Sequence, residues 1–63
     1  MTLAEFRGAC GGMIAIEPNE VMYVHEVELL GAQVVNVKLK NGKSFLLNEK
    51  YEDVISDLEL YSN

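Results

Sequence analysis

The stretch "VKLKNGKSFLLNEKYEDVISDLEL", residues 37–60, decides the fold that the sequence predicts. Apolar residues and lysines alternate over 37–40, which is the period of a half-buried strand. Asn-Gly at 41–42 follows directly, and this dipeptide is a strong hairpin signal because both residues accept positive φ in a type I′ turn. Residues 43–48 then return as a second strand with Phe45 and Leu47 facing inward.

The second half of the same stretch predicts a helix. Asn48 has the side chain of a helix N-cap, and acidic residues follow where the helix dipole is positive. An apolar stripe continues with i, i+3, i+4, i+7 spacing, formed by Tyr51, Val54, Ile55, Leu58 and Tyr61. A helix of about three turns is marginal alone in water, so this one must dock on the sheet.

Two further strands precede this hairpin. Residues 13–17 and 20–30 show β alternation, and a bulge near Val24–His25 would restore the phase of the longer strand. Residues 1–12 form an N-terminal arm, either one helical turn or an edge strand, and residues 13–63 form a single small β-β-β-β-α domain. The predicted fold class is α+β: a small antiparallel β-meander of four strands followed by one C-terminal α-helix.

The chain has 63 residues. The core of so small a domain rarely contributes more than about 3–5 kcal/mol to the free energy of unfolding, unless a disulfide, a metal or self-association adds to it. Cys10 and His25 are the only cysteine and the only histidine, which excludes an internal disulfide and argues against a structural zinc site. We therefore predict no metal and no cofactor, and we expect self-association to provide the additional stability. A single free thiol suits a reducing compartment, so we expect a cytoplasmic location.

The net charge of −5 argues against nucleic acid as a partner, because nucleic-acid binders normally carry a basic excess. No signal peptide and no membrane span are expected, since the apolar runs are short and interrupted by glycine. The composition instead favours a protein partner, with a second copy of this chain as the first candidate.

The sequence has more apolar residues than one helix can cover, and this predicts a homo-oligomer. The terminal helix can cover only one sheet face, and the opposite face is expected to carry Met13, Met22, Val24, Leu30 and Leu46. An exposed apolar area of this kind and open strand edges both favour association. From this set we predict an interface made of Met22, Val24, Leu30 and Leu46.

No catalytic constellation is evident, so we expect no enzyme activity and no catalytic residues. His25 and Glu26 are neighbours on a strand, so their side chains point to opposite faces. Cys10 with His25 could form a nucleophile and a base, but no third group that would orient them is apparent.

Residues 13–61 resemble the FlbD-like family of small proteins encoded with flagellar genes. The resemblance rests on "LKNGKSFLL", "YEDVISDL" and the earlier "IAIEPNEVMYVHEV", whereas the opening "TLAEFRGACGGM" departs from the family pattern. It implies an accessory or assembly role and no catalytic residues. "VVNVKLKNGKSF" is also similar to the first motif of Sm-like RNA-binding proteins, but the residues that grip the base in that family are missing after Gly42.

The predicted function is a non-enzymatic, self-associating module for protein interaction or assembly. One alternative is nucleic-acid or nucleotide binding by an oligomeric small β protein, through the basic patch of Lys38, Lys40 and Lys43. A second alternative is a small acidic inhibitor, encoded by a phage, that acts on a host or defence protein.

Overall fold

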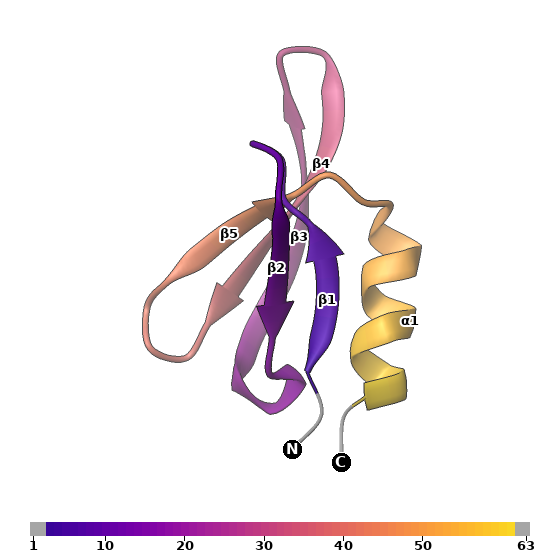
Figure 1. The fold of residues 1–63 in the computed structure, drawn as a ribbon. Coiled ribbons are helices and arrows are strands. Elements are labelled where there is room, and N and C mark those ends of the chain that lie inside the picture. The colour runs from indigo at the N-terminus through magenta and orange to yellow at the C-terminus, as the bar shows by residue number, and fades with distance from the viewer. Residues whose placement is uncertain (1–2, 62–63) are drawn as a thin grey trace.

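A computed structural model describes residues 3–61 and confirms an α+β fold with a C-terminal helix (Figure 1). The elements are β1 (Ala4–Arg7), β2 (Met13–Ile16), the 3₁₀ helix η1 (Pro18–Glu20), β3 (Val21–Leu29), β4 (Ala32–Leu39), β5 (Ser44–Leu47) and α1 (Tyr51–Tyr61). The last three strands and the helix follow the predicted order, and the described part of the predicted arm contributes a strand of its own.

The strands form two antiparallel sheets, β1–β2 and β3–β4–β5. The meander is therefore three-stranded, and β2 pairs with β1 instead of extending the longer sheet. Gly11 and Gly12 adopt φ values of 93° and 77°, which lets the chain reverse between β1 and β2. The two sheets meet where Gly8 bridges Leu47 and the Asn48 N–H donates to the Arg7 carbonyl at 2.8 Å.

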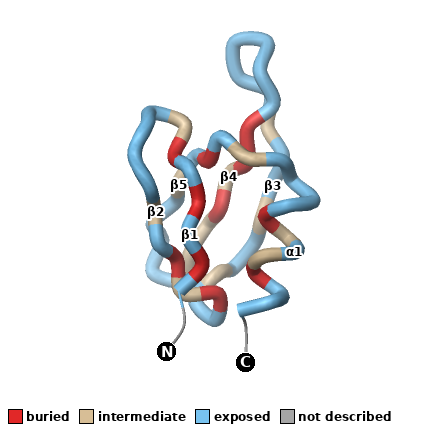
Figure 2. Tube along the Cα trace, turned by 45° about the vertical axis from the view of Figure 1, so that its right-hand side comes forward, coloured by how far each residue is buried: buried red, intermediate tan, exposed pale blue. Residues whose placement is uncertain are grey.

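The core lies between the two sheets and under α1, as the buried segments in Figure 2 show. It comprises Ala4, Phe6, Ile16, Val35, Val37, Leu47, Val54 and Leu58. Ala4 and Phe6 come from β1, so residues from both sides of position 12 share this core. Of the two conformations predicted for the first twelve residues, the strand is correct over Ala4–Arg7, and residues 1–2 lie outside the described range.

The bulge of β3 lies earlier than the sequence predicts. The register with β4 shifts between Val21 and Tyr23, which brings Val24 opposite Val37. Directly paired residues share a sheet face, so Val24 points toward the core and packs against it. Its predicted place on the uncovered face is therefore wrong, because the extra residue is inserted at Met22 and reverses the phase of everything after it.

The two hairpin turns of the meander use different geometries. The pairing of Leu29 with Ala32 leaves a two-residue loop, and both of its residues have positive φ, 51° at Leu30 and 82° at Gly31. This is the backbone pattern of a type I′ turn.

The Asn-Gly turn between β4 and β5 is not type I′, contrary to the prediction. Among the described non-glycine residues only Leu30 has a positive φ, so Gly42 alone is left-handed here, at 93°. Gly42 N–H donates to the Leu39 carbonyl at 3.0 Å, and Leu39 N–H donates to the Lys43 carbonyl at 2.8 Å. These bonds define a three-residue loop, in which a type I turn is followed by a glycine bulge.

Helix α1 packs against both sheets through a narrow apolar stripe. Val54 and Leu58 are buried, Ile55 is half-buried, and the tyrosines at the two ends, Tyr51 and Tyr61, are exposed. The predicted N-cap is wrong: the helix begins at Tyr51, after Lys50 has accepted the first helical bond from Val54. Asn48 lies before the helix, where its backbone joins the two sheets.

Candidate interaction surfaces

The predicted interface residues lie on different parts of the surface. Leu30 is fully exposed in the β3–β4 turn, Met22 is 56% exposed at the bulge, and Leu46 is 38% exposed on β5. Val24 is half-buried and packs against the core. The structure therefore replaces one predicted patch with separate apolar sites.

The tip of the β3–β4 hairpin projects from the body of the molecule (Figure 1). The principal extents of 35 × 22 × 20 Å reflect this elongated shape. Leu29 is 45% exposed and Leu30 is 100% exposed, so two adjacent leucines stand in solvent at the far end. Leucine in the left-handed region is uncommon and strained, which makes an apolar side chain at this turn notable.

The outer face of the β3–β4–β5 sheet mixes apolar and polar rows. Directly paired residues define these rows, because they share a face. One row is His25, Asn36 and Leu46, a second is Tyr23, Lys38 and Ser44, and a third is Val27 and Val34. Val54 and Leu58 of α1 pack on the opposite, core-directed face. Within these rows Val34 is buried, and Tyr23, His25, Ser44 and Leu46 are exposed.

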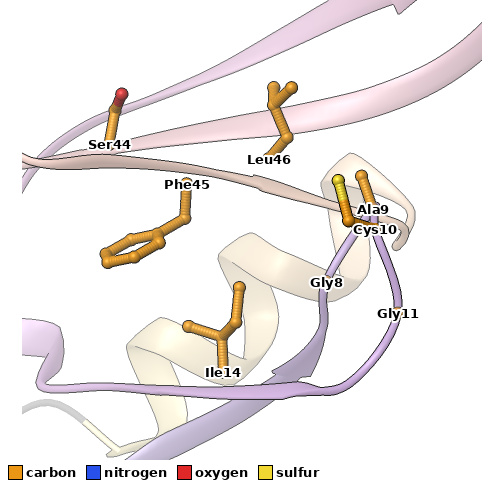
Figure 3. Close-up of a pocket in the computed structure, with 8 residues that line it drawn as sticks. All are labelled: Gly8, Ala9, Cys10, Gly11, Ile14, Ser44, Phe45 and Leu46. Atoms are coloured by element: carbon orange, nitrogen blue, oxygen red, sulfur yellow. The ribbon is translucent and has the colours of Figure 1, made fainter.

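An open hollow of about 410 Å³ lies between the β1–β2 turn and β5. Figure 3 shows Ile14 of β2 and Phe45 of β5 pointing toward the same space, whereas Ser44 and Leu46 point to the other side of β5. Ala9 and Cys10 lie at the end where the β1–β2 turn meets β5. The lining residues are Gly8, Ala9, Cys10, Gly11, Ile14, Ser44, Phe45 and Leu46.

The absence of a side chain at Gly8 leaves space in this hollow. A Cβ on Gly8 would lie 3.1 Å from Ile14 Cδ1 and 3.2 Å from the Gly11 carbonyl oxygen, so a side chain there would crowd the floor. The Ala9 N–H donates to the Leu46 carbonyl at 2.9 Å and fixes the turn against β5. The volume falls within the range of about 300–1,000 Å³ that is typical of small-ligand pockets.

The three predicted lysines lie at the end of β4 and in the turn that leads to β5, and none of them lines the hollow. Lys38 is directly paired with both Tyr23 and Ser44, and Lys43 precedes Ser44 in the chain. Lys40 is exposed, and its N–H donates to the Glu20 carbonyl at 2.8 Å. Ser44 points to the other side of β5 in Figure 3, so Lys38, its direct partner, lies on the outer face of the sheet and not in the hollow.

The structure brings together no acid–base pair from the predicted candidates. His25 belongs to the outer face of β3, whereas Glu26 is paired with Val35 on the core side of that sheet. Cys10 is exposed at the hollow. Within residues 3–61, no group of three or more His, Cys, Asp or Glu side chains could hold a metal ion.

The search for a membrane-spanning helix and the comparisons with known proteins found nothing that assigns a role to these surfaces. Over the described part of the chain, no helix has the length and apolar character that crossing a bilayer requires. No protein-family model matches the chain, and no curated protein and no solved structure matches it either. The resemblance to the FlbD-like family therefore stays a prediction from the sequence.

Sequence reasoning missed the hollow altogether. Its walls come from residues 8–14 and 44–46, which are far apart in the chain and meet only because β1 crosses the end of β5. The signal that could have indicated it is the glycine-rich "GACGG", residues 8–12, which favours a close approach of two backbones as well as a turn.

Proposed function

We propose that this protein is a non-enzymatic, self-associating module for protein interaction or assembly. The observation that carries the proposal is the exposure of large apolar side chains on surfaces that α1 does not cover. They include Met13 at 61%, Met22 at 56%, Leu29 at 45% and Leu30 at 100%. Burying such area is the main favourable term in protein association.

The small size of the core supports the same proposal. The fully buried side chains of the described chain are few, and none of them is larger than Phe6. A core of this size supplies only about 3–5 kcal/mol, so contacts with a second copy would add substantially to stability.

The test is the mass in solution, measured by sedimentation equilibrium over a dilution series. We expect masses above the monomer value of 7.0 kDa that decrease on dilution. Association through apolar contacts should persist at high salt, because salt screens charges and strengthens apolar burial only slightly. A mass of 7.0 kDa at every concentration would contradict the proposal.

Nucleic-acid binding is a second candidate, and the pairing of Tyr23 with Lys38 favours it. An exposed aromatic ring beside a lysine on an open sheet face is the arrangement on which single-stranded bases stack. Fluorescence anisotropy with a labelled single-stranded oligonucleotide tests it. Binding at low salt that Tyr23→Ala abolishes would support this candidate, and no binding at low salt would exclude it.

A further inference from the structure

We propose that the free edge of β5 binds an extended, uncharged segment of another protein, which pairs with β5 as an added strand and covers the hollow. The free edge of β5 is the backbone of residues 44–46 on the side away from β4. The inference goes beyond the proposed self-association, because it assigns a binding site and a kind of partner that self-association does not require.

The hydrogen-bond pattern of β5 shows which backbone groups face outward. On the β4 side, Leu39 N–H donates to the Lys43 carbonyl at 2.8 Å, and on the opposite side Ala9 N–H donates to the Leu46 carbonyl at 2.9 Å. Backbone groups alternate between the two edges along an antiparallel strand. The N–H and the carbonyl of Ser44 therefore point away from β4, as the carbonyl of Leu46 does.

Strand β1 occupies only one end of this edge. Gly8 bridges Leu47, and Ala9 forms the next bond along β5. The chain then turns back toward β2, with Gly11 N–H donating to the Gly8 carbonyl at 3.1 Å. No described strand pairs with β5 beside Ser44, because β5 is the last strand of its sheet. The position that β1 would fill if it continued is therefore open to a strand from outside.

The hollow lies along this free edge. Ser44 and Leu46 line it, yet Figure 3 shows their side chains pointing to the other side of β5, so they present backbone to the hollow. Phe45 lies between them and points toward Ile14, and both of these side chains are half-buried. An added strand uses both features, because main-chain bonds give affinity and pockets for alternate side chains give specificity.

The lining of the hollow decides the chemistry of the partner. None of its eight residues is Asp, Glu, His, Lys or Arg, although 24% of the chain is charged. Burial of a charged group against such walls is costly, so an uncharged segment complements them. Every second side chain of a strand lies on the same face. We therefore expect apolar residues at alternate positions of the bound segment.

The probes are acetylated, amidated heptapeptides with threonine at odd positions and valine, isoleucine, leucine or phenylalanine at even positions. Most of these residues favour the extended conformation. Binding is followed by NMR titration of the full, nitrogen-15-labelled chain. We expect the amide signals of Ser44 and Ile14 to shift, and the Ser44 N–H to exchange more slowly because it now donates to the peptide.

Ser44→Pro removes the N–H that faces the added strand. Proline is tolerated on an edge strand where its nitrogen faces solvent, so the pairing of β5 with β4 should remain. We expect the Kd of the best probe to rise about three- to tenfold, the effect of one hydrogen bond. Ser44→Ala is the matched control, since it keeps the N–H and should leave the Kd unchanged.

A change in the peptide tests the same bonds in the unaltered protein. Methylation of one peptide nitrogen at a time removes one donor. Only every second N–H of an added strand points toward β5. Binding should therefore weaken at alternate positions, whereas simple apolar adsorption would show no such alternation.

The outcomes are distinct from those for self-association, which sedimentation measures without peptide. Failure of every probe to bind overturns the inference, and so does equal binding by Ser44→Pro and by all methylated probes. Protection of the Ser44 amide that rises with protein concentration alone would assign the edge to a second copy and also overturn it. A strictly monomeric chain that binds the probes as described supports the inference and contradicts the proposed self-association.

Discussion

Each of the two turns of the β3–β4–β5 meander contains a left-handed glycine, yet the two turns fold differently. Leu30–Gly31 forms the type I′ turn, whereas Asn41–Gly42 lies in a three-residue loop with only the glycine left-handed. Strand register explains the difference, because Leu29 pairs with Ala32 in the first hairpin and Leu39 bonds Lys43 in the second. The comparison teaches that cross-strand pairing can override the preference of a turn dipeptide.

Gly42→Val should give the largest effect on this comparison. A β-branched residue at a φ of 93° is strained by about 1–2 kcal/mol, and the turn sets the register that places Leu47 in the core. We expect the free energy of unfolding, measured by urea denaturation, to fall by that amount.

Gly31→Val is its counterpart in the other turn, at a φ of 82°. The β3–β4 tip stands clear of the core, so we expect faster amide exchange over residues 27–34 and a smaller change in global unfolding. Equal global losses for the two variants would show that the projecting hairpin is not energetically separate from the body.

Leu30→Asn should stabilise the monomer by about 1 kcal/mol, because asparagine tolerates the left-handed region better than leucine does. The measurement is urea unfolding at concentrations where sedimentation shows a monomer, so that association does not contribute. A loss of stability under those conditions would mean that Leu30 supports its own hairpin.

Asn41→Ala should give the smallest change. It removes the bond from the Lys43 N–H to Asn41 Oδ1, which is 2.9 Å long and exposed, and such bonds contribute about 0.5 kcal/mol. Thermal unfolding should therefore show a slightly lower midpoint. Lys40→Ala, next to it in the same loop, serves as the control and should leave the midpoint unchanged.

The elements of the fold were predictable where local periodicity is strong. The alternation over residues 33–40 and the stripe of Val54 and Leu58 gave β4 and α1 nearly to their observed ends. Strand pairing was not predictable in the same way, because β2 could pair with the strand before it or with the strand after it. The glycine conformations that direct it to β1 depend on φ values that glycine permits but does not require.

The candidate surfaces were predictable only in part. Leu30 and Leu46 stood out as apolar residues that the helix could not shield, and both are exposed. Val24 was misplaced because a bulge shifted by two residues moves a side chain to the other face. The hollow was missed because its walls meet only through a long-range crossing, which no local pattern encodes.

The contact of β1 with α1 and with the segment just before it has a consequence for how the chain is made. The Arg7 N–H donates to Glu49 Oε2, before the start of α1, at 2.9 Å across 42 positions, and Phe6 shares the core with Val54 and Leu58 of the helix. During translation, β1 emerges long before the helix that seals it, and a lone two-stranded hairpin is barely stable in water. The nascent chain therefore carries an unsealed Phe6 until synthesis reaches the helix, and ribosome-bound intermediates should expose it to chaperones.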